Sequence, residues 1–95
     1  MKKILLLSIL SGLSAPILAA PNGELLASHC YQCHGFEGRS LGEIDSIGGE
    51  SFSDLYGDLK EFQNNGKKDI MSLQSRLYTD AELRAISEYF STLPH

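Results

Sequence analysis

Apolar residues recur at helical spacing near the C-terminal end of the chain. The residues of this stripe are Leu83, Ile86, Tyr89, Phe90 and Leu93. Positions three or four residues apart share one face of a helix. Thr79 and Glu82 precede the stripe at the spacing of a capping box, and Pro94 stops it. The pattern predicts a helix that begins near Thr79 and ends before Pro94.

A second stripe, in the middle of the chain, comprises Leu55, Leu59 and Phe62. Ser51 precedes it, and Asp54 follows Ser51 by three residues, so that an Asp stands where Glu or Gln completes most capping boxes. Gly66 is typical of the residue that closes a helix. We expect a second helix between these limits.

The stretch from 23 to 33 is also compatible with a short helix. Asn22 is a candidate N-cap, and Glu24 falls in the first turn, where the helix dipole favours an acid. Leu26 and Cys30 are four residues apart and so share one face. This helix would carry the first cysteine towards the core.

Five glycines crowd the segment that follows, namely Gly35, Gly38, Gly42, Gly48 and Gly49. Such a density opposes both helix and strand and predicts a loop. Nowhere does the sequence sustain the two-residue alternation of a strand. The predicted fold class is therefore all-α.

The N-terminal end has the pattern of a secretory signal peptide. Lys2 and Lys3 precede an apolar run over residues 4–18, which ends in the small residues Ala19 and Ala20. The pattern predicts export, and in a bacterial cell the destination would be the periplasm.

A membrane anchor is the competing interpretation of this run. An anchor needs about 20 consecutive apolar residues, whereas the run is shorter and is interrupted by Gly12 and Pro16. A cut after position 19 keeps Pro21 away from the scissile bond. We therefore expect a signal peptide over 1–19, a mature domain over 20–95, and no stable membrane insertion after cleavage.

Composition and charge narrow the function classes. The chain of 95 residues is 42% hydrophobic and 21% charged, which is typical of one small domain. Loss of Lys2 and Lys3 with the signal peptide changes the formal net charge from −4 to −6, which excludes a nucleic-acid binder. A core of this size stabilises a fold only weakly, so we expect a disulfide, a metal or a cofactor as well.

The two cysteines of the chain lie in the run Cys30-Tyr31-Gln32-Cys33-His34. Two thiols three residues apart at the end of a helix lie side by side and can form thioethers with the two vinyl groups of one haem. The next residue, His34, can place its imidazole on the iron as the proximal axial ligand. The motif predicts one covalently attached haem c per chain.

Three other uses of this motif are weaker. A thioredoxin-like dithiol would sit in a βαβ setting, and a disulfide between Cys30 and Cys33 would close a very short loop. A structural zinc site needs four protein ligands, and beyond the motif the mature chain offers only His29, His95 and scattered carboxylates. None of the three explains why His34 follows the second cysteine.

The sixth coordination position decides between electron transfer and ligand chemistry. Met71 is the single methionine of the mature chain and lies in the polar, loop-like stretch 67–72. A thioether that projects from a loop suits a distal ligand, and we predict that Met71 fills this role. The alternative is a methionine that fills a gap beneath the haem.

The other histidines are poorer ligand candidates. His29 adjoins Cys30 and is held on the attachment side, so we expect a surface residue. His95 is the last residue and follows Pro94, so we expect a mobile end.

Together these features resemble the small bacterial class I c-type cytochromes. The resemblance rests on the signal peptide, on Cys30-x-x-Cys33-His34-Gly35, on the glycine-rich loop, on Met71 and on the closing segment from Tyr78 to Phe90. It implies three or four helices around one haem with His and Met axial ligands. It also implies that the first and last helices cross, so that Leu26 would meet Tyr89 or Phe90.

Within that family, residues 44–49 and the closing helix are similar to the cytochrome subunit of flavocytochrome c sulfide dehydrogenase and to related periplasmic shuttles. Family members usually carry a proline near Asp45, in the neighbourhood that supplies a backbone carbonyl to the free ring nitrogen of the proximal histidine. This loop contains no proline. Loss of that contact would leave the imidazole of His34 less well oriented and less basic.

The resemblance implies a soluble monohaem electron carrier and not an enzyme. An electron-accepting subunit of a flavin-dependent sulfide oxidoreductase is the first alternative, and a haem protein that binds small gases or peroxide is the second. Redox partners would dock transiently at the haem edge, and the chain would be a monomer or the small subunit of a heterodimer. Lys60, Lys67 and Lys68 form either a basic docking patch or a solvated loop, and Tyr78 either contacts the haem or staples the last helix.

Overall fold

The computed structural model describes residues 20–95, and this part of the chain consists of helices and loops without a strand. The prediction of an all-α fold is thereby confirmed. The predicted signal peptide, 1–19, lies outside the described residues. Within the described part, every helix is too short or too polar to cross a membrane.

The segment that carries the cysteines is helical in three consecutive stretches, as expected. These are α2 (Gly23–Ala27), the 3₁₀ helix η1 (Ser28–Cys30) and α3 (Tyr31–His34). Asn22 caps α2, because its side-chain oxygen accepts a hydrogen bond from the Leu25 N–H at 3.0 Å. The segment ends at Gly35, whose φ of 87° lies in the left-handed region that favours glycine.

The glycine-rich segment is a loop that contains one 3₁₀ turn, η2 (Phe36–Gly38). Its shape depends on Gly38, whose φ is 79° and whose carbonyl accepts hydrogen bonds from Ile47 N–H at 2.8 Å and Gly48 N–H at 3.1 Å. A Cβ on Gly38 would lie 2.6 Å from the Gly48 nitrogen. The two arms of the loop can therefore close only on a residue without a side chain.

The two longest helices have the predicted caps. Ser51 Oγ accepts from the Asp54 N–H at the start of α4 (Phe52–Asn64), which is one half of the predicted capping box. Thr79 and Glu82 form the complete capping box of α6 (Asp80–Ser91), with bonds of 2.8 and 3.1 Å. Helix α4 ends just before Gly66, which has a φ of 73°, so these helix boundaries are confirmed.

One helix differs from the sequence-based prediction. Residues 67–72 were expected to form a loop, but Ile70–Ser75 form α5. Asp69 caps this helix by accepting the Ser72 N–H at 2.9 Å, and this hydrogen bond lowers the pKa of the Asp69 carboxyl. Six residues are too few to display a periodic apolar stripe.

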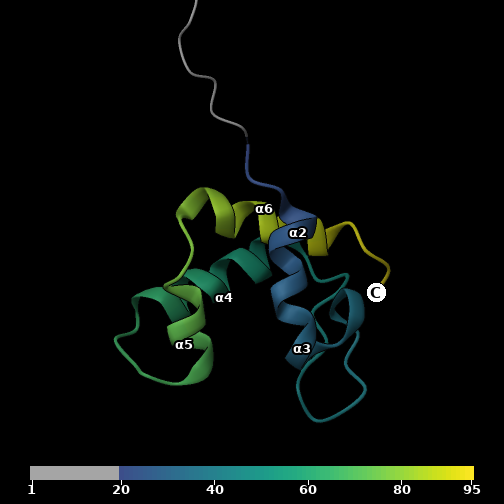
Figure 1. Ribbon diagram of the computed structural model, residues 1–95, viewed down its shortest axis with the longest axis horizontal. Coiled ribbons are helices and arrows are strands. Elements are labelled where there is room, and N and C mark those ends of the chain that lie inside the picture. The colour runs from purple at the N-terminus through teal and green to yellow at the C-terminus, as the bar shows by residue number, and fades with distance from the viewer. Residues whose placement is uncertain (1–19) are drawn as a thin grey trace, which may run out of the picture.

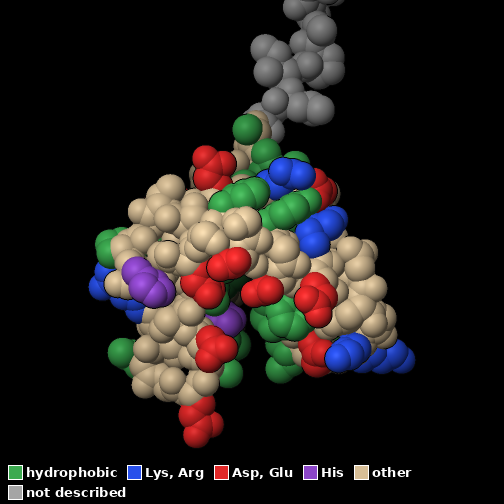
Figure 2. Space-filling view, turned by 180° about the vertical axis from the view of Figure 1, so that it is seen from behind, with side chains coloured by type: hydrophobic (Ala, Val, Ile, Leu, Met, Phe, Trp, Pro, Cys, Tyr) green, Lys and Arg blue, Asp and Glu red, His purple; other side chains and the backbone are tan. Residues whose placement is uncertain are grey.

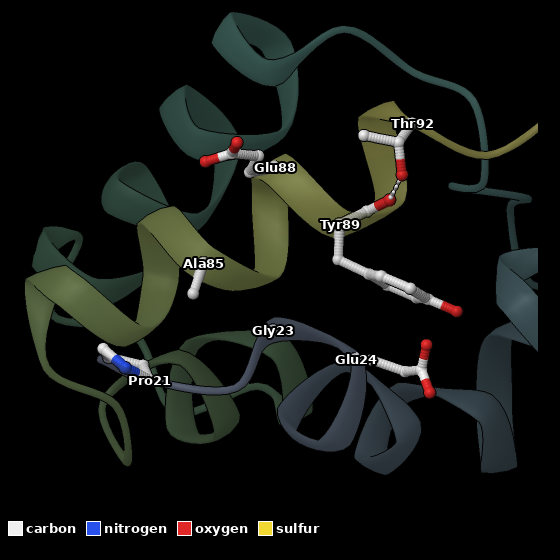
Figure 3. Close-up of a pocket in the computed structure, with 7 residues that line it drawn as sticks. All are labelled: Pro21, Gly23, Glu24, Ala85, Glu88, Tyr89 and Thr92. Atoms are coloured by element: carbon white, nitrogen blue, oxygen red, sulfur yellow. Dashed lines mark hydrogen bonds between the residues drawn. The ribbon is translucent and has the colours of Figure 1, made fainter. Parts of the chain in front are cut away.

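The core forms where the first and last helices cross. The described residues at its centre are Ala27, Leu55, Ile86 and Phe90, with Leu26 and Tyr89 packed around them, as the family resemblance implies. Gly23 of α2 faces Ala85 of α6 (Figure 3), and both line a pocket of about 300 Å³. A Cβ on Gly23 would lie 2.4 Å from the Ala85 carbonyl oxygen. The absence of a side chain at Gly23 thus sets how closely these helices approach.

Helices α2, α4 and α6 together form a layer, from which two lobes project (Figure 1). We call residues 28–49, which include η1, α3 and the glycine-rich loop, the histidine lobe. We call residues 66–78, which include α5, the methionine lobe. In Figure 1, α3 and α5 lie on opposite sides of the gap below α4.

Candidate functional site

The cysteines lie at one end of the helical segment and are not bonded to each other. Cys30 is half-buried against the core, whereas Cys33 is exposed. Burial, with a smaller contribution from the nearby Cys33, raises the pKa of the Cys30 thiol to about 11. A redox-active dithiol needs a thiol that ionises easily, so the raised pKa of Cys30 opposes the thioredoxin-like interpretation.

The zinc interpretation lacks support as well. Among residues 20–95, no three His, Cys, Asp or Glu side chains converge on one point. Tetrahedral zinc needs four such ligands. Cys30, Cys33 and His34 therefore suit attachment at separate points of one larger group better than a shared ion.

His34 is oriented by a backbone carbonyl of the glycine-rich loop. Its Nδ1 lies 2.6 Å from the Asp45 carbonyl oxygen. Because a carbonyl only accepts, Nδ1 donates, and the neutral ring keeps the lone pair of Nε2 for a metal ion. The same hydrogen bond makes the imidazole a more basic ligand.

This contact, which the missing proline put in question, is present although the loop has no proline. Beyond Asp45, the chain is held by the bonds from Ile47 and Gly48 to the Gly38 carbonyl. In addition, Ser46 Oγ accepts the Ser40 N–H at 2.9 Å. These hydrogen bonds fix the Asp45 carbonyl in the way that a proline fixes φ elsewhere.

Both lobes expose large apolar side chains. Those in the histidine lobe are Phe36, Leu41 and Ile44, and those in the methionine lobe are Ile70, Leu73 and Leu77. Leu41 is fully exposed. Figure 2 shows a hollow between the lobes with apolar side chains at its edges and a histidine within it. This surface, next to two free thiols and an oriented imidazole, fits a large, flat, apolar group.

Met71 is a half-buried residue in the first turn of α5, and α5 is anchored on α4. Gln63 of α4 donates from Nε2 to the Ser75 carbonyl at 3.1 Å and to the Tyr78 carbonyl at 2.9 Å. Arg76 Nε donates to the Gln63 carbonyl at 3.2 Å. The methionine therefore lies on a short helix that is fixed at its C-terminal end, and not on a loop.

His29 is exposed, as predicted, but it is also engaged in a contact that the sequence did not predict. Its Nδ1 lies 3.1 Å from the Tyr78 hydroxyl, and the two rings stack with centroids 6.4 Å apart. Tyr78 also packs against the core. The two residues are 49 positions apart, so no local pattern could reveal the pair.

The last residue lies beside the glycine-rich loop. The backbone of His95 is next to Gly49, where a Cβ would come within 2.4 Å of the His95 Cα; the mobility of this end stays a prediction. Gly49 in turn donates its N–H to the Phe90 carbonyl at 2.9 Å. The glycine-rich loop thus packs against the last residue, because Gly49 has no side chain.

Of the three lysines in the suspected basic patch, one is paired with an acidic side chain and two are exposed. Lys60 pairs with Asp80 at 3.2 Å and donates to Gln63 Oε1 at 3.1 Å. Hydrogen bonds from Tyr56 and Arg84 hold the pKa of Asp80 at about 2, so this carboxylate is charged at neutral pH. Lys67 and Lys68 remain exposed at the start of the methionine lobe.

Comparison with known proteins gives several relatives, while no protein-family model matches the sequence. Cytochrome c-553 of Helicobacter pylori (strain ATCC 700392 / 26695) is 33% identical over 97 residues, which cover 98% of this chain and 99% of the relative. Cytochrome c-553 of Nitratidesulfovibrio vulgaris is 30% identical, covering 98% of this chain and 100% of the relative. The cytochrome subunit of sulfide dehydrogenase from Chlorobaculum tepidum is 36% identical over 72 residues, which cover 75% and 66% of the two chains.

Proposed function

This chain belongs to the small c-type cytochromes, and from that premise we propose which residues hold its haem and where in the cell it works. It is an electron carrier and not an enzyme, and its cofactor is covalently bound haem c. When bound, the haem iron supplies reversible one-electron chemistry. Cys30 and Cys33 form the thioethers, and His34 and Met71 are the axial ligands.

The observation that carries this assignment is the 2.6 Å contact between His34 Nδ1 and the Asp45 carbonyl. It selects the tautomer whose Nε2 is free to bind iron, and it fixes the plane of the ring. A histidine that served only as a surface residue would gain nothing from such an arrangement. The position directly after Cys33 places this imidazole beside the attachment points.

The assignment of Met71 as the second iron ligand is supported by its position in the methionine lobe, opposite the histidine lobe that carries His34. It lies in the first turn of α5, whose other end is fixed by Gln63. A thioether donates less to the ferric state than an imidazole does, so His and Met ligation gives a comparatively positive potential. The exposed apolar side chains of the two lobes would exclude water from the iron.

We further propose export through a signal peptide over 1–19 and function of the mature domain, 20–95, in the periplasm. Redox proteins would dock transiently at the haem edge, and Lys67 and Lys68 are the exposed cations nearest to Met71 in the sequence.

A second candidate function is the electron-accepting subunit of a flavin-dependent sulfide oxidoreductase. The similarity to the Chlorobaculum tepidum subunit favours it. Copurification with a flavoprotein would identify that role.

Absorption spectra and a redox titration of the haem-loaded protein test the ligand assignment. In Met71→Ala, we expect loss of the methionine-to-iron charge-transfer band and a lower reduction potential. Lys68→Ala, which removes an exposed cation just before the same helix, should retain the band. Identical spectra and potentials for wild type and Met71→Ala would refute Met71 as the ligand. A high-spin ferric spectrum of the wild type would favour gas or peroxide binding instead.

A further inference from the structure

The two lobes are joined by a direct contact between side chains. His29 Nδ1 in the histidine lobe lies 3.1 Å from the Tyr78 hydroxyl at the end of the methionine lobe. The rings stack at an interplanar angle of 27°. The direction of the hydrogen bond depends on the histidine tautomer, but both directions connect the same two atoms.

The Tyr78 side of this contact is rigid. Gln74 of α5 donates from Nε2 to the Tyr78 hydroxyl at 3.0 Å. Gln63 of α4 donates to the Tyr78 carbonyl at 2.9 Å, and the ring packs against the core. Burial raises the pKa of the Tyr78 hydroxyl, which therefore stays neutral. The hydroxyl therefore accepts a hydrogen bond from α5 on one side and contacts His29 on the other.

The His29 side is tied to the haem attachment point. His29 immediately precedes Cys30 in η1, and Cys30 packs against the core. His34 follows Cys30 by four residues within the same helical segment. A restraint on the His29 ring is thus passed to the segment that carries both thiols and the proximal imidazole.

We propose that the hydrogen bond between His29 and Tyr78 is a clasp that holds the two lobes at a fixed separation and thereby keeps Met71 on the iron. His29 and Tyr78 are then positioning residues for the distal ligand. This inference rests on the proposed role of Met71. The soft thioether binds ferric iron weakly, so a competing ligand displaces it once the methionine lobe moves away. The clasp opposes that movement.

Imidazole titration of the ferric, haem-loaded protein measures the effect, because imidazole replaces the thioether and removes its charge-transfer band. One hydrogen bond has a net contribution that corresponds to about a twofold to tenfold change in an equilibrium. We expect Tyr78→Phe and His29→Ala each to tighten imidazole binding by about this factor. The double variant should bind no more tightly than the stronger single variant, because both changes remove the same bond.

Tyr56→Phe is the matched control. The Tyr56 hydroxyl donates to Asp80, a bond that joins α4 to α6 and involves neither His29 nor Cys30. Its loss should lower the urea midpoint and leave imidazole affinity unchanged. Because His29 is exposed, His29→Ala keeps the test available even where Tyr78→Phe folds poorly.

Two results would overturn the clasp: wild-type imidazole affinity in both single variants, or additive effects in the double variant. Failure of the underlying ligand assignment looks different, because Met71→Ala would then retain the charge-transfer band. The two ideas are therefore tested by separate variants of the same protein.

Discussion

At the scale of single residues, main-chain groups orient the proximal ligand of the haem site. His34 is oriented by the Asp45 carbonyl and not by a side chain. That carbonyl is placed by bonds of Ile47 and Gly48 to Gly38, which can make them only because it lacks a Cβ. The proximal ligand is therefore controlled by a glycine seven residues before the carbonyl that it positions.

This leads to a prediction about two loop residues. Gly38→Ala should destabilise the haem-loaded protein by about 1–3 kcal/mol, because alanine is strained at a φ of 79° and its Cβ would meet the Gly48 nitrogen. A weaker contact to His34 makes the imidazole less basic and so raises the reduction potential. Urea unfolding and redox titration measure both effects.

Asp45→Ala is the control, because it keeps the carbonyl that His34 contacts and removes only an exposed carboxylate. Its potential should remain close to that of the wild type. A lower potential in Gly38→Ala, or an equal shift in both variants, would contradict the assignment of this role to the main chain.

At the scale of elements, the features that could be predicted are those with a local signal. The apolar stripe and capping box of α6 are such features, because their residues are close in sequence. Helix α5 has six residues and only the Asp69 cap to mark it, so its sequence does not distinguish it from a loop. The Asp45 carbonyl and the His29–Tyr78 pair have no local signal, since a carbonyl is common to all residues and the pair depends on tertiary structure.

The crossing of α2 and α6 yields a second prediction. Gly23→Ala should destabilise the protein by about 1–3 kcal/mol, because the new Cβ would lie 2.4 Å from the Ala85 carbonyl oxygen and force the helices apart. Gly57→Ala in α4 is the matched control, because a Cβ there meets nothing within 4 Å. Alanine at this helical position should stabilise by about 0.5–1 kcal/mol. Thermal and urea unfolding compare the two, and destabilisation of equal size in both would argue against close packing at Gly23.

At the scale of the whole molecule, the polypeptide supplies a small core and leaves a large apolar surface uncovered. Among residues 20–95, the buried hydrophobic residues are Ala27, Leu55, Leu83, Ile86 and Phe90. The exposed apolar side chains of the two lobes are at least as numerous. Figure 2 shows apolar side chains at the edges of the hollow between the lobes. A domain of this size with so few buried side chains has a small free energy of unfolding. Its cofactor is therefore part of its core.

The last prediction concerns the chain without that cofactor. Cys30→Ser/Cys33→Ser removes both attachment points, and we expect the product to lose most of its helical circular dichroism and its cooperative unfolding transition. The physical reason is that the core has few buried side chains, and that the short helices of the lobes are unstable in water without an apolar partner. The wild-type protein prepared with haem is the control. Cooperative unfolding of the double variant, with a midpoint like that of the control, would mean that α2, α4 and α6 fold unaided. The apolar surfaces of the two lobes would then have to be explained by a protein partner instead of by haem.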